Sequence, residues 1–230
     1  MKLRVPYPYI KALSYAMPDA DIRPYFNGVI IDPVRGYITA TDDTVLLMFT
    51  TREQMLGYTG TQFCIAGEAI MHIVRGVKAL ATDEVYVDVS WDEHTVQSST
   101  GTPEPRITGT LSCQGVTANF HAPASMTTTI DLSGPVRAAT PEHVVPPVAP
   151  SQEPLYDSKS LRKVELIAKL MTKSGVEPVR SDATSATRFL IGGQDPSRVA
   201  LVVVNTTRTP RLPWDEFLRT SDNKTAHYKF

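Results

Sequence analysis

Cysteine is scarce in this chain of 230 residues, and long hydrophobic runs are missing from it. Its two cysteines, Cys64 and Cys113, have no partner at C-x-x-C spacing, which favours two buried thiols in a reducing compartment over a disulfide. No run approaches the ~18 consecutive apolar residues of a membrane-spanning helix. The first residues, MKLRVP, contain no apolar stretch typical of a signal peptide. The sequence therefore predicts a cytoplasmic protein that does not contact a membrane.

Net charge is also nearly absent. The chain has 23 Lys and Arg residues and 24 Asp and Glu residues, which gives a formal charge of −1. This balance excludes a simple polycation that coats nucleic acid. Any contact with DNA needs an uneven distribution of charge over the surface.

Signatures of catalysis are missing as well. The five histidines show no metal-ligand spacing such as H-E-x-x-H, and neither G-x-S-x-G nor a phosphate-binding glycine loop occurs. The acidic pairs Asp42-Asp43 and Asp83-Glu84 fall at turns, and adjacent residues on a strand point to opposite faces. The sequence predicts a protein that is not an enzyme and uses no metal or cofactor.

The sequence does contain a repeated pattern of one helix followed by several strands. Helical spacing of Ile10, Leu13 and Met17 predicts a helix over 7–17, which Pro18 ends. A second helix over 67–80 has Ile70, Ile73, Val74, Val77 and Leu80 on one face. Alternating runs predict strands at 26–32, 36–41, 44–50, 62–66, 84–90, 94–99, 107–114 and 116–122.

A third copy of the pattern follows. A strand is predicted at 127–132, and a Pro-rich connector covers 134–154. The helix over 157–173 can be capped by Asp157 or Ser158 and has an apolar stripe of Leu161, Val164, Ile167, Ala168 and Met171. Strands are predicted at 176–181, 187–191 and 199–205. The fold class is α+β, with repeated helix-plus-antiparallel-strands units.

Two motifs in the first fifty residues resemble the bacterial DNA polymerase III β sliding clamp family. D-I-R-P-Y-F-N-G (21–28) and A-T-D-D-T-V-L (40–46) are similar to the family's D-V-R-x-x-L-N-G and A-T-D-G-H-R-L, in the same order and at similar separation. The resemblance implies a DNA-clamp-like fold. It divides the chain into a clamp-like domain of two repeats (1–132), a Pro-rich linker (133–154), a third repeat (155–208) and a C-terminal tail (209–230). The short length resembles clamp-like proteins of bacteriophages, which would place it in the host cytoplasm.

The resemblance implies two sites. In the family the helices face the hole of a ring, so basic helix residues are expected to contact duplex DNA through phosphates. The predicted DNA-binding residues on or beside the helices are Lys11, Arg75, Lys78, Lys159, Arg162, Lys163, Lys169 and Lys173. Arg23 and Tyr25 are added from the loop in which the family presents groups toward DNA, as a phosphate contact and a stacking group, although Tyr25 can instead pack on the sheet. The family's partner-peptide cleft maps onto Phe26, Thr41, Thr44, Val45, Leu46, Pro146 and Val203. Here Asp43-Thr44-Val45 replaces the family's Gly-His-Arg.

Plainer alternatives stay open for these residues. The basic side chains can form an ordinary solvated helix face, and Phe26, Leu46 and Val203 can be core residues. Trp214, Phe217 and Leu218 can form an amphipathic turn that docks on the chain itself or on a partner. The first functional hypothesis is a homo-oligomeric clamp-like protein that associates with duplex DNA and tethers a DNA polymerase or another replication protein. The second is a clamp-fold protein that does not encircle DNA and binds a host replication or defence protein.

Overall fold

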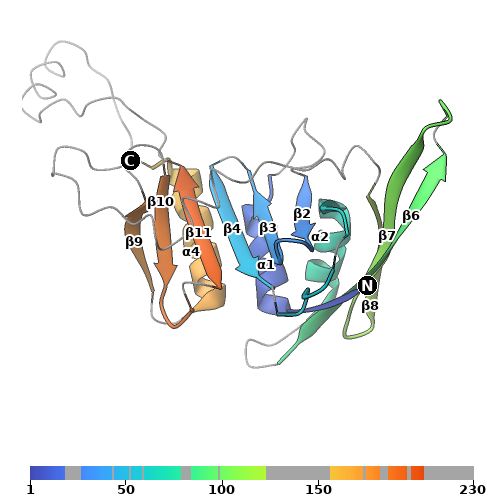
Figure 1. The fold of residues 1–230 in the computed structure, drawn as a ribbon. Helices are drawn as coiled ribbons and strands as arrows, with labels where there is room; N and C mark the ends of the chain where they lie inside the picture. The colour runs from blue at the N-terminus through green and yellow to red at the C-terminus, as the bar shows by residue number, and fades with distance from the viewer. Residues whose placement is uncertain are drawn as a thin grey trace, which may run out of the picture.

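The fold of the chain is given by a computed structural model and is α+β, as the sequence predicts (Figure 1). The structure describes residues 1–18, 27–42, 44–51, 53–58, 60–78, 84–97, 99–122, 156–172, 175–181, 186–195 and 198–204. The predicted strand at 127–132, the linker and the tail lie outside these ranges. The predicted domain boundaries therefore stay a prediction.

Three units follow one another along the chain. The first unit contains β1 (Lys2–Pro6), α1 (Tyr7–Ala16), β2 (Gly28–Asp32), β3 (Tyr37–Thr41) and β4 (Val45–Thr50). The second contains β5 (Phe63–Ala66), α2 (Gly67–Gly76), β6 (Tyr86–Gln97), β7 (Pro103–Cys113) and β8 (Val116–Ala122). The third contains α4 (Ser158–Met171), β9 (Val176–Ser181), β10 (Ala186–Ile191) and β11 (Val199–Val204).

The described strands form two antiparallel sheets. One has four strands in the order β1-β6-β7-β8, and the other has seven in the order β5-β2-β3-β4-β11-β10-β9. The third unit joins the first through the β4–β11 pair, in which Leu47 is opposite Leu201. The larger sheet therefore contains strands of all three units, with β5 of the second unit at one end and β9 of the third at the other.

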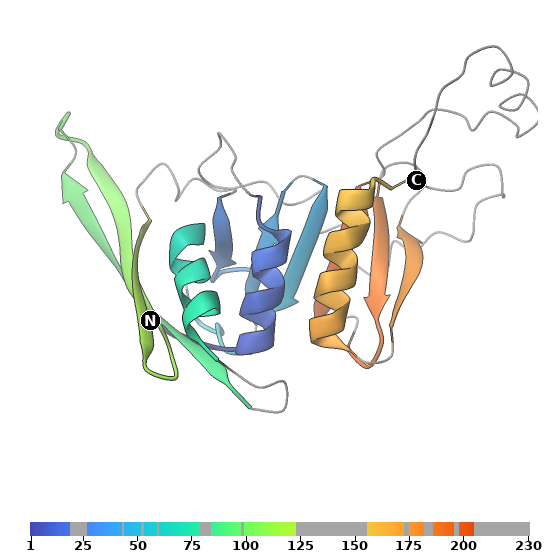
Figure 2. The same cartoon turned by 180° about the vertical axis from the view of Figure 1, so that it is seen from behind.

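Among the described residues, helices α1, α2 and α4 lie side by side on one side of the strands, with α1 between the other two (Figure 2). Each helix buries one apolar face: Ile10 and Leu13 from α1, Ile70 and Ile73 from α2, and Ile167 from α4. Burial of such side chains contributes about 1.5–3 kcal/mol each. The opposite helix faces are left free to carry polar residues.

An aromatic cluster fills the core between the sheets of the first two units. Phe63 of β5 lies 5.3 Å from Trp91 of β6 and 6.0 Å from Phe120 of β8, measured between ring centroids. Cys64 and Cys113 are buried free thiols, as predicted. Burial raises the pKa of Cys64 to about 12, so this thiol stays protonated at neutral pH.

Several element predictions were wrong in detail. Strand β1 was not predicted, because only Leu3 and Val5 alternate with charged residues before Pro6. The predicted strands at 84–90 and 94–99 form one strand, β6, in which Trp91 points inward. Helix α2 ends at Gly76 instead of residue 80, since Val77 is already extended. Leu161, assigned to the apolar stripe of α4, is 43% exposed.

Helix α4 begins with a side-chain cap from Asp157. Its carboxylate accepts hydrogen bonds from the backbone N–H of Ser160 (2.9 Å) and from the Ser160 hydroxyl (2.6 Å). We expect Asp157→Ala to lower the free energy of unfolding by about 1 kcal/mol, and Asp157→Ser to restore most of it. Urea denaturation measures both changes, and an unchanged Asp157→Ala midpoint would contradict the capping role.

Candidate nucleic-acid interface

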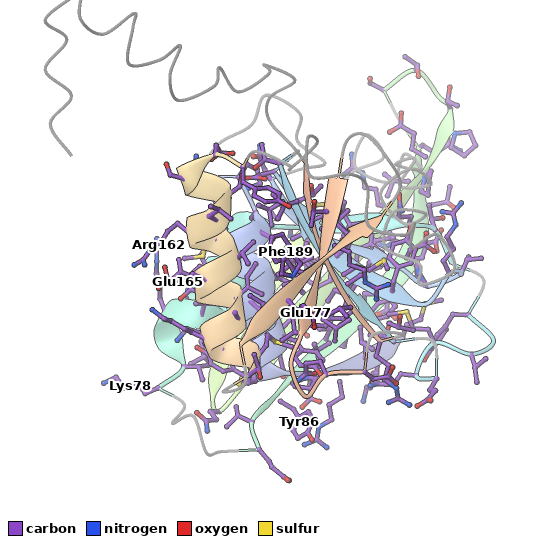
Figure 3. The ribbon with its side chains drawn as sticks, turned by 90° about the vertical axis from the view of Figure 1, so that its left-hand side faces the viewer. Lys78, Tyr86, Arg162, Glu165, Glu177 and Phe189 are labelled. Carbon is purple, nitrogen blue, oxygen red and sulfur yellow. The ribbon has the colours of Figure 1, made fainter. Side chains whose placement is uncertain are left out.

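Helix α4 presents a basic surface that points away from the sheet. Four of its residues are basic (Lys159, Arg162, Lys163 and Lys169) and one, Glu165, is acidic. Lys159, Arg162 and Lys169 are exposed. Figure 3 shows Arg162 and Glu165 on the side of α4 opposite the strands, whereas Phe189 of β10 lies on the strand side. Because Val164, Ile167 and Met171 occupy the buried face, the charged side chains have only the outer face available.

Glu165 neutralises part of this surface. Its carboxylate accepts hydrogen bonds from Lys169 (2.5 Å) and Arg162 (2.6 Å). These two cations, Lys169 first, lower the pKa of Glu165. The pair of bridges is solvated and contributes little to stability. The two bridges hold Arg162 and Lys169 on the same side of α4 as Glu165. With Lys159, this side has three exposed basic residues against one acidic residue.

The other helices add fewer basic groups to the same side. Arg75 near the end of α2 and Lys78 just after it are exposed, and Lys11 of α1 is half-buried. Lys78 lies on the same side of the molecule as Arg162 in Figure 3. The structure therefore brings six of the ten predicted DNA-binding residues onto its helical side: Lys11, Arg75, Lys78, Lys159, Arg162 and Lys169.

Lys163 has a different environment from its neighbours on α4. Its ammonium group lies 2.6 Å from Asp42 Oδ2 and donates a second hydrogen bond to the carbonyl oxygen of Met17 (3.0 Å). The two side chains of the ion pair are only 11% and 9% exposed. Lys163 thus connects α4 to the end of α1 and to the β3–β4 turn, and its charge is already compensated.

Several hydrogen-bond donors hold the side chain of Asp42 in the β3–β4 turn. Its Oδ1 accepts hydrogen bonds from the backbone N–H groups of Thr44 and Val45 and from the Thr44 hydroxyl. Burial by itself acts to raise the pKa of Asp42, but the hydrogen bonds from Lys163, Val45 and Thr44 together lower it below its usual value. The sequence indicated only a turn here, because nothing in it shows that residue 163 faces residue 42.

Three predicted DNA-binding residues, Arg23, Tyr25 and Lys173, lie outside the described residues, as do Phe26 and Pro146 of the predicted cleft. The remaining cleft residues come together where β3, β4 and β11 meet. Thr41 pairs with Leu46, and Val45 pairs with Val203. Val45, Leu46 and Val203 are buried, and only Thr44 is half-buried.

Within the described residues, no group of three or more His, Cys, Asp and Glu side chains is arranged to hold a metal ion. Across that same part of the chain, none of the helices has the length and hydropathy needed to cross a bilayer.

The arrangement of the described helices and antiparallel sheets matches the fold of solved DNA sliding clamps. The chain is similar to the DNA polymerase III β subunit of Thermotoga maritima, with 15% identity over 91% of this chain and a TM-score of 0.54. It is also similar to the DNA polymerase sliding clamp of Pseudomonas aeruginosa, with 14% identity over 90% of this chain and a TM-score of 0.55. No protein-family model and no curated protein sequence matches the chain.

The similarity is one of fold, since both identities are low. The chain spans about two thirds of these proteins, 66% of the Thermotoga subunit and 67% of the Pseudomonas clamp. The clamp-like fold that the first fifty residues predict is confirmed.

Proposed function

We propose that this protein is a sliding-clamp-like scaffold that associates with duplex DNA through its helical side and tethers a replication protein. The observation that supports the proposal best is the position of α1, α2 and α4, side by side on one side of the sheets, with exposed basic residues on α2 and α4. The clamp fold of the similar proteins supports it as well. No catalysed reaction is needed for this function.

The proposed contact is electrostatic and independent of DNA sequence. Lys159, Arg162 and Lys169 can reach phosphate oxygens from the outer face of α4, and Arg75 and Lys78 can do so from α2. Phosphate contacts carry no base information, which is the property that allows movement along DNA. Because the formal charge of the whole chain is −1, attraction to DNA depends on this side of the molecule.

The test compares two variants with equal loss of charge. Lys159→Ala/Arg162→Ala/Lys169→Ala removes three positive charges from α4. We expect this variant to weaken binding to a fluorescent duplex by about tenfold or more at low salt. Each lost phosphate contact reduces the number of counterions that DNA releases on binding, and this release favours the complex. The loss should be the same for duplexes of unrelated sequence.

The matched control is Lys2→Ala/Arg4→Ala/Arg106→Ala, which removes three exposed positive charges from β1 and β7. We expect this variant to bind duplex DNA like the unsubstituted protein. Equal weakening by both variants would show that only net charge matters. An unsubstituted protein that does not bind DNA would favour the second hypothesis, a clamp-fold protein that recognises another protein.

The tethering part of the proposal concerns the meeting point of β3, β4 and β11. Thr44 is the described residue there with an accessible side chain, so it is the proposed contact for a peptide of a polymerase or another replication protein. This function belongs in the cytoplasm of a bacterial cell, or of an infected host if the gene is of phage origin.

A further inference from the structure

Glu165 lies inside the basic surface of α4, between the two cations that it contacts. The sequence of the helix, SKSLRKVELIAKLM, contains four basic residues and one acidic residue. Arg162 precedes Glu165 by three positions and Lys169 follows it by four, a spacing that places the three side chains on one face of the helix. Figure 3 shows Arg162 and Glu165 together on the side of α4 away from the strands. The carboxylate is therefore part of the surface that the proposed function assigns to DNA.

Both oxygens of this carboxylate are engaged by the basic groups. Glu165 Oε1 lies 2.5 Å from Lys169 Nζ, and Oε2 lies 2.6 Å from Arg162 Nη1. The side chains are 45% exposed for Glu165, 66% for Lys169 and 61% for Arg162. All three groups are thus accessible to a ligand that approaches α4 from solvent.

The fold of α4 does not depend on this carboxylate. The helix is anchored by the buried side chains of Val164, Ile167 and Met171, and its first turn is capped by Asp157. Glu165 lies near the middle of the helix, away from the N-terminal turn where a negative charge stabilises the helix dipole. Solvated ion pairs contribute little to stability. Glutamine, with a helix propensity close to that of glutamate, can therefore replace Glu165 without loss of structure.

A phosphate group and the Glu165 carboxylate need the same partners. A phosphate that takes the donors of Arg162 and Lys169 used by Glu165 must displace the carboxylate. The remaining N–H groups of the two cations can also bind a phosphate, but that phosphate then lies next to a carboxylate of like charge. By either route, Glu165 cancels about one of the positive charges that α4 offers to DNA.

We propose that Glu165 is a positioning residue that limits the affinity of α4 for duplex DNA, by holding Arg162 and Lys169 in two bridges with which a phosphate must compete. The inference rests on the proposed function and concerns the strength of that contact. Movement along DNA requires phosphate contacts that exchange readily. A carboxylate on the same helix face gives both cations an alternative partner between one phosphate and the next.

The experiment compares full-length Glu165→Gln with the unsubstituted protein. The substitution keeps the length of the side chain and removes its charge. We expect Glu165→Gln to bind a fluorescent duplex about tenfold more tightly at about 50 mM salt. The slope of log Kobs against log salt concentration should be about 0.9 larger in magnitude, the contribution of one additional phosphate contact. Fluorescence anisotropy at several salt concentrations measures both quantities.

Glu177→Gln is the matched control for charge. It removes one negative charge from β9, where Glu177 is exposed, and Figure 3 shows Glu177 on the strand side of α4. We expect its affinity and its salt slope to equal those of the unsubstituted protein. An equal gain from both variants would show that only net charge matters and would overturn the inference.

A second comparison tests whether Glu165 acts through the two cations. In the background Arg162→Ala/Lys169→Ala, we expect Glu165→Gln to change affinity by less than about twofold, because coupled residues do not contribute additively. An undiminished gain in this background would contradict a positioning role. Urea unfolding should give the same midpoint for Glu165→Gln and the unsubstituted protein, which separates an effect on DNA binding from an effect on folding.

Failure of this inference can be distinguished from failure of the proposed function. An unsubstituted protein that binds duplex DNA, together with a Glu165→Gln variant of the same affinity and slope, would overturn the role of Glu165 and leave the DNA contact in place. If neither protein binds duplex DNA at low salt, the proposed function and the inference both fail.

Discussion

Lys163→Met is expected to lower the free energy of unfolding by about 3 kcal/mol, the lower end of the cost of breaking a buried ion pair. The substitution keeps an unbranched apolar side chain and removes the ammonium group from Asp42 and from Met17 O. The carboxylate of Asp42 would then be held without a cation in a site that is 9% exposed. Urea unfolding followed by circular dichroism measures the change.

Lys169→Met is the matched control on the same helix. It breaks an ion pair of similar length, but both partners are solvated, so we expect a change within about 0.5 kcal/mol. For DNA binding the order of the two effects should be reversed. Lys169→Met should weaken binding, and Lys163→Met should leave it unchanged at temperatures where it is folded. Equal stability of the two variants would contradict the structural role of Lys163.

The contribution of Asp42 also has a defined pH dependence. Its pKa in the folded protein lies below the unfolded value of about 3.9. The stabilisation is therefore complete above the unfolded pKa and is lost as the pH falls through the lower folded pKa. We expect the stability difference between the unsubstituted protein and Lys163→Met to be constant near neutral pH and to shrink below about pH 4.

Gly28→Ala is expected to destabilise the protein by about 3 kcal/mol, the upper end of the cost of overpacking. A Cβ atom at Gly28 would lie 1.9 Å from the carbonyl oxygen of Ile65 and 2.9 Å from Cys64 Sγ. Gly28 pairs with Ala66 at the start of β2, so β2 and β5 would have to separate. Thermal and urea unfolding measure the loss.

Gly60→Ala is the comparison for this prediction. The nearest atom to a Cβ at Gly60 is Glu93 Oε2 at 3.2 Å, the end of a flexible and exposed side chain. We expect a change within about 0.5 kcal/mol. If Gly28→Ala is as stable as Gly60→Ala, the close approach of β2 and β5 is not as described.

Much of the fold could be predicted from the sequence because local patterns of apolar residues indicate its helices and most of its strands. Ile10 and Leu13, or Val164 and Ile167, recur at helical spacing and are buried as expected. The clamp-like fold could be recognised from residues 21–28 and 40–46 because two dipeptides in them meet requirements of the backbone. Asn27-Gly28 stands where two strands approach closely, and Thr41-Asp42 stands at the β3–β4 turn. Gly28 shows why, since only glycine leaves room for Ile65 O.

Other features of the molecule depend on contacts between residues that are distant in the sequence. Lys163 and Lys169 look alike in the sequence, yet one contacts Asp42 from 121 positions away and the other contacts Glu165 on its own helix. Strand β1 could not be recognised, because it pairs with β6, and the paired residues are 80 to 88 positions apart. Strand β11 pairs with β4, and no local pattern places the two side by side.

The central claim, that the helical side contacts DNA phosphates, is tested most directly by the salt dependence of duplex binding. Each phosphate contact contributes about 0.9 to the slope of log Kobs against log salt concentration. We predict a slope about two to three smaller in magnitude for Lys159→Ala/Arg162→Ala/Lys169→Ala than for the unsubstituted protein, and an unchanged slope for Lys2→Ala/Arg4→Ala/Arg106→Ala. Equal slopes for all three proteins would contradict the claim.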